Sequence, residues 1–461
     1  MMQRLGAAAA KVLFLGMFAA GVLCLPALPV NAQSPQANAP KMGDAGDLEV
    51  RRQQLLRAML AEPDNLDIAF SYAALSARAG DFEAAISTLE RMLIYAPGLP
   101  RVQLELGVLY YRLGAFDVAK QYFDAAVSAP DVPREVRERV NIYQAGIAQA
   151  QAPAKFSAAV IVGARWQSNA NAAPGDRSVT LNGLDFLLNE SAVSQSDFNA
   201  YLATTAHVSY DLARQGDLLE ADLLFYGARY AELSRLHTEI AEVTVGPSFN
   251  MARFGWDEAR LGVYAILGGV RLDEANYSGT LGAGARLAWL PRIRSRLESK
   301  SEFRRRWFND SPTYPSVSDR NGYRISSQLA YTYFLTAGLA VRGAVSGARE
   351  DTKTDAEDYF EAGVSAGLRK TFASPLKVVE QAWFVDLDAG YVARWYDVPD
   401  SAINAADSQK DDEYWLRSTL TVPVAEDWAL MMTGEYRRAV SNYPTDDYAN
   451  GSVSVSVMKK F

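Results

Sequence analysis

The sequence predicts an α + β protein of two domains, an α-helical array followed by an antiparallel β-barrel of about 14 strands. Pro63 and Pro97 lie 34 residues apart within a stretch of helical periodicity. From residue 153 onward, apolar and polar residues alternate as they do in strands with one wet and one dry face. The connections between these strands are alternately short and long. These observations place a domain boundary near residue 152.

Residues 1–32 have the pattern of a secretory signal peptide. Arg4 and Lys11 precede a short apolar run that is broken by prolines, and Ala32 occupies a cleavage position. No later stretch is long and apolar enough for a transmembrane helix. We therefore expect an exported chain in which any membrane span is made of strands.

The mature chain is expected to contain no cysteine, because Cys24 belongs to the signal segment. This excludes disulfides and thiolate metal sites. Loss of Arg4 and Lys11 moves the formal charge from −8 to −10, which does not suit non-specific binding to nucleic acid. Residues 33–47 are expected to form a flexible linker.

Residues 48–152 carry two copies of the tetratricopeptide pattern, at 66–99 and 100–133. Gly107 and Ala119 permit a close approach of two helices, and Phe123 fills the space between them. The second copy has the expected residue types at Leu106, Gly107, Tyr110, Gly114, Ala119, Phe123 and Ala126. The helices before and after the two copies are expected to act as a half-repeat and a polar cap.

The first helices of the two repeats are expected to line a concave surface that binds a peptide or a partner protein. An alternative role is that the array only spaces or plugs the following domain. The candidate groove residues are Phe70, Arg78, Arg101, Leu104, Tyr111 and Arg112.

Residues 153–461 are predicted to form a transmembrane barrel with lipid outside and water inside. Short connections such as 214–217 and 336–338 alternate with long polar ones that begin at Ser168, Asn309 and Asp397. Short turns in the periplasm and long loops outside are typical of outer-membrane barrels, so the repeats are expected in the periplasm. Phe461 ends the last strand and is expected to serve as the barrel's C-terminal assembly signal.

One predicted strand carries a row of seven charged residues on a single face. On the lipid side, each of these charges would cost up to ~2–4 kcal/mol at mid-depth, so we expect the row to face a wet lumen. There it is expected to conduct, to grip a substrate or to pair with acidic neighbours. The row consists of Arg294, Arg296, Glu298, Lys300, Glu302, Arg304 and Arg306.

None of the catalytic patterns in the sequence has the structural context that its chemistry requires, and we expect neither enzyme activity nor a cofactor. Gly363–Gly367 matches the nucleophile-elbow pattern but is predicted to lie within a strand, with no later histidine. His207 and Ser209 are similar to the catalytic pair of outer-membrane phospholipase A, but the alternation turns them towards the lumen. With two histidines in all, a transition-metal site is not expected either.

The combination of signal peptide, short repeat array and C-terminal barrel resembles the surface lipoprotein assembly modifier (Slam) family of Gram-negative outer-membrane proteins. The segment "FSAAVIVGARWQSNANAAPG" is similar to the family's barrel entry, and the resemblance extends from Leu48 to Phe461. It implies a translocator that delivers client lipoproteins or related secreted proteins to the cell surface. The implied partners are the client, a periplasmic chaperone, the barrel-insertion machinery and outer-membrane lipid.

Two other functions are compatible with the pattern. An exopolysaccharide export porin also couples a repeat scaffold to a barrel, and a basic lumen would suit an acidic polymer. A passive diffusion porin would leave the repeats without a role.

Overall fold

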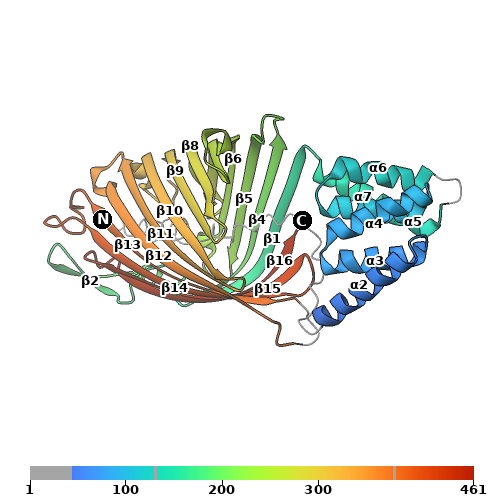
Figure 1. Cartoon of the computed structure of the whole chain (residues 1–461). Coiled ribbons are helices and arrows are strands. Elements are labelled where there is room, and N and C mark those ends of the chain that lie inside the picture. Colours follow the sequence, from blue (N-terminus) through green and yellow to red (C-terminus); the bar gives the residue numbers. More distant parts are fainter. Residues whose placement is uncertain (1–43, 129–131, 377–380) are drawn as a thin grey trace. The chain divides into compact units, whose positions relative to one another are not determined.

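The computed structural model describes residues 44–128, 132–376 and 381–461. The chain divides into a helical unit that ends at Ala152 and a β-unit from Pro153 to Phe461, and Figure 1 shows both. The predicted signal peptide and residues 33–43 of the predicted linker lie outside the described residues. None of the described helices is long and apolar enough to cross a membrane.

The described part of the helical unit contains six helices, two for each predicted repeat and one on either side of the pair. The Asn65 side chain caps the first helix of repeat one by accepting a hydrogen bond from the Ile68 amide (3.3 Å). Asp81 caps the next helix in the same way through the Ala84 amide (3.1 Å). The six helices are α2 (Asp44–Ala61), α3 (Leu66–Ala79), α4 (Phe82–Tyr95), α5 (Pro100–Arg112), α6 (Phe116–Ser128) and α7 (Arg134–Ala150).

Close packing inside the second repeat depends on Gly107. A Cβ atom at this position would lie 2.5 Å from the ring of Phe123. Phe123 and Ala119 are completely buried, and both belong to the core between α5, α6 and α7. The predicted roles of these three residues in helix packing are confirmed.

The β-unit is a closed antiparallel barrel of 14 strands, as predicted. β1 (Ala154–Gln167) pairs with β4 on one side and with β16 on the other, which closes the barrel (Figure 1). The other strands are β4 (Asp197–Asp211), β5 (Leu218–Tyr230), β6 (Thr238–Asn250), β7 (Ala259–Leu272), β8 (Ala275–Arg292), β9 (Ser295–Phe308), β10 (Gly322–Thr336), β11 (Leu339–Thr352), β12 (Tyr359–Phe372), β13 (Trp383–Tyr396), β14 (Lys410–Pro423), β15 (Trp428–Ser441) and β16 (Tyr448–Lys460).

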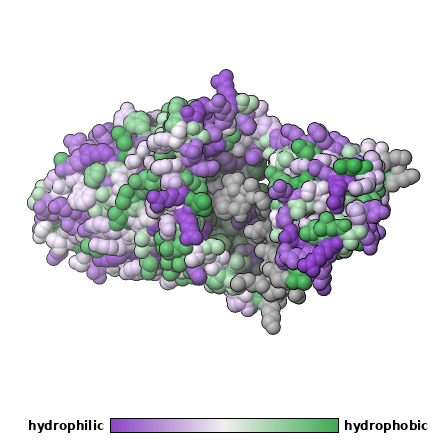
Figure 2. Space-filling model, viewed as in Figure 1, coloured by the Kyte–Doolittle hydropathy of each residue, from purple (hydrophilic) through white to green (hydrophobic). Residues whose placement is uncertain are grey.

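The outer face of the barrel is apolar and its inner face is polar. In β16, for example, Val453 and Val455 are exposed on the outside while Ser454 and Ser456 are buried inside. Figure 2 shows hydrophobic residues gathered over the strands on one face of the barrel. This alternation is what a barrel surrounded by lipid requires.

Tryptophans form two outward-facing levels at the ends of the strands. Trp307 and Trp395 lie near one end of the barrel, and Trp256 and Trp428 near the other; all four are exposed. Tyr396, next to Trp395 at the end of β13, instead points inward and is 6% exposed. The two levels match the aromatic girdles of membrane barrels.

Connections at the two ends of the barrel differ in length. At the end where β1 begins, which we call the entry end, the turns include 212–217, 251–258, 293–294, 337–338 and 424–427. The opposite end, which we call the loop end, carries the long segments 168–196, 309–321 and 397–409. The first of these contains a hairpin of its own, β2 (Ser178–Leu181) and β3 (Leu184–Leu187), which the sequence did not predict.

Candidate functional site

The first helices of the two repeats present a basic and aromatic surface. The Arg101 guanidinium on α5 lies 5.4 Å from the ring centre of Phe70 on α3, a cation–π contact between the two repeats. Arg78 and Arg112, at the ends of the same two helices, are exposed. Phe70 is partly buried and packs against the core of the helical unit, so three of the six predicted groove residues, all of them arginines, are exposed.

The other two predicted groove residues are turned towards the interior of the helical unit. Leu104 is 1% exposed and packs in the core formed with α6 and α7. Its inclusion in the groove was wrong, because this side of α5 faces the neighbouring helices and not solvent. Tyr111 is partly buried and makes an edge contact with Tyr143, with ring centres 5.3 Å apart.

A second polar contact joins the two repeats. The Tyr110 hydroxyl donates a hydrogen bond to Glu90 (2.9 Å), and the Tyr110 ring stacks on that of Tyr122 at 5.5 Å. Burial and the Glu90 carboxylate raise the pKa of Tyr110 to about 12. The contact fixes α4 against α5 and α6.

In the barrel, the predicted charge row lines the inner face of β9. Phe303 and Trp307 on the same strand are exposed outside, whereas Glu302 and Arg304 are buried inside. Six of the seven charged residues lie on the strand. Arg294, the seventh, lies in the turn before it.

The basic residues of the charge row on β9 form ion pairs with carboxylates, so they do not make a continuous row of unpaired positive charges. Arg304 contacts Glu242 on β6 at 2.5 Å and Glu302 at 3.0 Å. Lys300 also pairs with Glu302, at 2.8 Å. Nearer the entry end, Arg296 pairs with Glu298 at 2.9 Å. Of the three uses that the sequence left open for this row, the geometry favours mutual pairing.

The last member of the row, Arg306, begins a longer chain of charges around the lumen wall, which we call the arginine–glutamate ladder. Each of its four glutamates pairs with two arginines, so five positive charges alternate with four negative ones. Most members are largely buried, so the ladder is desolvated and held by charge-assisted hydrogen bonds. In order, its members are Arg306, Glu350, Arg324, Glu361, Arg394, Glu413, Arg437, Glu435 and Arg417.

None of the four glutamates of the ladder was predicted from the sequence. Glu350, Glu361 and Glu413 each occupy an inward position near the loop end of their strand, with exposures of 2%, 6% and 2%. A charged residue at an inward position of a barrel strand is ordinary, so each glutamate alone gives no signal. Pairing becomes visible only when the order of strands around the barrel is known.

Loops at the loop end bond to one another in a closed circle, which we call the outer loop collar. Asn182 in segment 168–196 donates to the carbonyl of Ser401 in segment 397–409 (2.9 Å). On its other side, segment 168–196 accepts a hydrogen bond from Arg235 through Ser191 (2.8 Å). The Tyr314 hydroxyl, in segment 309–321, donates to the Arg235 carbonyl (2.5 Å).

Two further backbone bonds complete the circle. The Lys353 amide donates to Asn321 (2.8 Å), and the Asp397 amide donates to Asp358 (3.0 Å). The collar therefore consists of segments 168–196, 231–237, 309–321, 353–358 and 397–409. Segment 442–447 joins it through Tyr443, whose hydroxyl accepts a bond from the Asp400 amide (2.9 Å).

The collar folds into the lumen from two sides. Tyr314 and Val317 pack against Tyr226 and Ile240, which face inward from β5 and β6. On the other side, Ala172 packs with inward residues of β15 and β16. The loop end of the lumen is thus narrowed by ordered loops in this structure.

The Ser-Asn-Ala-Asn motif after β1 has a structural role in the collar. Asn169 bonds through its side chain to the Ala173 carbonyl (2.8 Å) and the Ala449 carbonyl (3.1 Å). Asn171, which is fully buried, donates to the Val193 carbonyl (2.8 Å) and accepts a hydrogen bond from the Gln195 amide (2.9 Å), so it holds the returning part of the loop. These two amides set the path of segment 168–196 as it leaves the barrel wall.

The residues with superficial catalytic patterns are embedded in the barrel wall. His207 Nδ1 lies 2.7 Å from the Asp222 carboxylate, which also accepts a hydrogen bond from Arg286 (2.7 Å). Gly363–Gly367 lies within β12, in regular pairing on both sides. Within the described residues, no cluster of histidine and carboxylate side chains has the arrangement of a metal site.

Comparison with known proteins agrees with the helical assignment. Residues 76–134 match the family model of the tetratricopeptide repeat. No curated protein matches the sequence.

Solved structures share only general features with this chain. It is similar to a bacterial polysaccharide outer membrane secretin (12% identity, TM-score 0.35, covering 66% of this chain and 98% of that one). It is also similar to the outer membrane channel DcaP of Acinetobacter baumannii (8% identity, TM-score 0.36, 67% and 97% covered). For MamA MSR-1 C2 the values are 22% identity, TM-score 0.20, and 24% and 65% covered. Scores this low carry no information on function.

Proposed function

We propose that this protein is an outer-membrane translocator that delivers lipoproteins or related secreted proteins to the cell surface. The observation that carries the proposal is a barrel with a charge-paired lumen and a mouth narrowed by its own loops, joined in one chain to a tetratricopeptide repeat array. In this proposal the repeats engage the client or a delivery factor, and the barrel provides the exit.

Placement in the outer membrane is supported by the barrel itself. It has an apolar outer face, two tryptophan levels and short turns at one end, as outer-membrane barrels have. Since β1 starts at the entry end and follows α7 after residues 151–153, the proposal places the repeats in the periplasm.

Export of an acidic polysaccharide is less well supported. That function would need a continuous row of cations open to the polymer. Arg304 and Arg306 are instead neutralised by Glu242 and Glu350. Because a polymer would have to break these buried pairs, the charge row argues against the polysaccharide exporter.

Passive diffusion is also less well supported. A diffusion porin needs a mouth that stays open, whereas the collar here folds inward. It would also leave the repeat surface around Phe70 and Arg101 without a role. If the lumen is gated by the collar, the purified protein should show low conductance in a planar bilayer, and Asn182→Ala should raise it by loosening the loop contacts.

The chemistry of the repeat surface indicates which part of a client it would engage. Arg78, Arg101 and Arg112 give it positive charge on a chain whose net charge is −8, and Phe70 adds an aromatic face. An acidic peptide segment with an apolar side chain would match it. Such a segment in a client or chaperone is the expected partner.

The experiment is protease shaving of intact cells that express a lipoprotein encoded beside this gene. Deletion of the translocator should remove the client from the surface while its total amount stays constant. Arg101→Glu should reduce surface exposure about tenfold, because it reverses the charge at the centre of the groove. Arg134→Glu is the matched control, since Arg134 is 91% exposed on a different helix, α7, and pairs with Glu138 of that same helix.

Two results would overturn the proposal. The first is unchanged surface exposure of every neighbouring lipoprotein after deletion. The second is loss of extracellular polysaccharide on deletion while lipoprotein exposure persists, which would assign the barrel to polymer export.

A further inference from the structure

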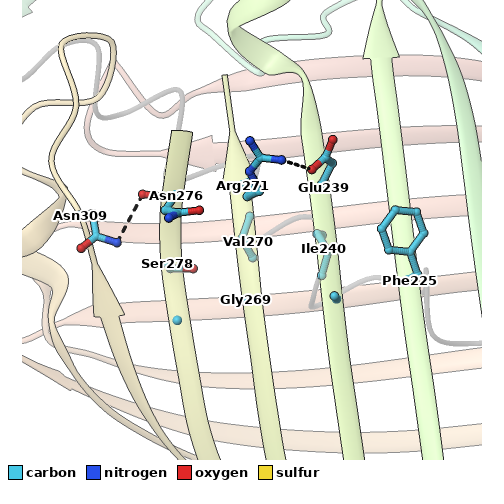
Figure 3. Close-up of a pocket in the computed structure, with 11 residues that line it drawn as sticks. Phe225, Glu239, Ile240, Gly269, Val270, Arg271, Asn276, Ser278 and Asn309 are labelled. Carbon is cyan, nitrogen blue, oxygen red and sulfur yellow. Dashed lines mark hydrogen bonds and ion pairs between the residues drawn. The ribbon is translucent and has the colours of Figure 1, made fainter. Parts of the chain in front are cut away.

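The outside of the barrel has a trough near the loop end, where three neighbouring strands lack bulky side chains. A row across the sheet runs from Phe225 on β5 through Ala241, Gly269 and Gly279 to Trp307 on β9, each paired with the next. Bulky rings thus border a floor of one methyl group and bare backbone. The hollow has a volume of about 430 Å³ and is drawn in Figure 3.

The fold itself does not require glycine at the floor of the trough. A Cβ atom at Gly269 would meet only the Ser278 carbonyl at 3.5 Å, and at Gly279 only the Trp307 ring at 3.5 Å, both ordinary contacts. Neither has a positive φ. Glycine inside a strand weakens it and often marks a place where a ligand approaches the backbone closely.

Along the direction of the strands, one side of the trough is apolar and the other side is polar. Towards the middle of the barrel, the next outward row is Leu223, Val243, Leu267 and Leu281, all exposed. Towards the loop end, the next row holds Glu239 and Arg271, followed by Asn276. Acyl chains suit the first side and a polar headgroup the second.

The polar edge carries two arginines, one on either side of a glutamate. Glu239 lies between two guanidinium groups, pairing with Arg271 at 2.9 Å and with Arg229. Both arginines are about half exposed, at 52% and 50% of the side chain. Each guanidinium also donates to a backbone carbonyl, Arg271 to Glu274 (2.9 Å) and Arg229 to Ala228 (3.3 Å). A guanidinium has five N–H donors, so others remain for a phosphate, whose geometry matches the guanidinium fork. Figure 3 shows the Arg271–Glu239 pair above the bare strand at Gly269.

We infer that this trough binds a phosphate-bearing lipid with several acyl chains in the outer leaflet. Four strand spacings separate Phe225 from Trp307, about 19 Å, which is wide enough for more than one acyl chain. The phosphate lies at Arg229 and Arg271, and the chains lie on the leucine and valine row. This site is separate from the lumen, and its occupation does not depend on what the barrel transports.

Native mass spectrometry of the full chain in mild detergent tests the site. The probe is a bis-phosphorylated, hexa-acylated disaccharide lipid, compared with the same lipid after removal of its phosphates. Gly269→Leu fills the floor and Arg271→Gln removes one charge, and each should weaken binding of the phosphorylated probe about tenfold, which is about 1.4 kcal/mol. The dephosphorylated lipid should bind the wild type as weakly as the phosphorylated one binds Arg271→Gln.

Matched controls come from another part of the barrel wall. Gly343 is an outward glycine on β11 with open space around it, so Gly343→Leu adds the same side chain elsewhere. Arg349 is an arginine at the loop end that pairs with one carboxylate, Asp397, so Arg349→Gln controls for loss of charge. Both variants should bind the probe as the wild type does. Wild-type binding would show that substitutions of these two kinds leave the barrel folded.

Three outcomes would overturn the inference. Equal binding of the dephosphorylated lipid would remove the role of the two arginines. Unchanged binding by Gly269→Leu would remove the trough. A dimer that disappears in Gly269→Leu, without lipid loss, would show that a second barrel occupies the surface. None of these outcomes bears on surface delivery of lipoproteins, so failure here and failure of the proposed function are distinguishable.

Discussion

Replacing Glu413 by glutamine should strongly destabilise the barrel. The Glu413 side chain is 3% exposed and lies between Arg394 and Arg437, which are 4% and 9% exposed. Glutamine keeps the shape but removes the negative charge, so two buried guanidinium groups lose the carboxylate that they share. Breaking a buried ion pair in this way costs about 3–5 kcal/mol.

An exposed pair on the same barrel provides the control. Arg349 and Asp397 form an ion pair with side chains 42% and 41% exposed. Because solvent screens it, Asp397→Asn should cost about 0–1 kcal/mol. Glu413→Gln should therefore lower the free energy of unfolding several times more than Asp397→Asn does.

The assay is equilibrium unfolding by urea of the barrel reconstituted in lipid vesicles, followed by tryptophan fluorescence. Gel mobility without heating shows whether each variant has assembled. A double variant, Glu413→Met with Arg437→Met, should lose less stability than the sum of the single changes, because the pair is removed together. If Glu413→Gln lowers the free energy of unfolding by no more than Asp397→Asn does, the arginine–glutamate ladder does not stabilise the barrel.

Three further predictions concern the repeats and the C-terminus. Gly107→Ala should destabilise the helical unit by about 1–3 kcal/mol, since the methyl group of the new alanine would collide with the buried Phe123 ring. Thermal unfolding followed by circular dichroism at 222 nm measures this loss. Phe461→Ala should lower the yield of assembled barrel in cells but leave unfolding unchanged, because the side chain is 60% exposed; equal yields would argue against an assembly signal. Burial and Glu90 raise the pKa of Tyr110 to about 12, so its stabilising contribution is complete below pH 10 and is lost as pH rises to 12. The stability advantage of wild type over Tyr110→Phe should accordingly narrow across that range, and a constant difference would contradict the assignment.

Periodicity was sufficient to predict most of the architecture. The helical period and two prolines located both repeats, and alternation placed Arg296 to Arg306 on the inner face of one strand. Local pattern decides these features, because each depends on residues two to four positions apart. The strand count followed from the same alternation and from the turns.

Features that depend on distant partners were not predictable. Glu242 pairs with Arg304 across 62 residues, and nothing in either strand alone identifies the other. The inward fold of segment 168–196 depends on Asn169 and Asn171, whose partners are backbone carbonyls and amides at several places in the chain. Leu104 was misplaced because the choice of exposed helix face depends on where α7 packs, and the repeat pattern does not specify that.

The outer loop collar also sets an order of events for folding. Asn182 and Ser401 are 219 residues apart, and β1 finds its second partner only in β16. Contacts of such high contact order form slowly, because most of the chain must be arranged first. The hydrogen bonds between the loops at the mouth therefore cannot all form until β13 and β14 are in place. A polypeptide arrested before that point would have the barrel wall without the collar. Formation of the last hairpins therefore determines when the barrel acquires its narrowed mouth.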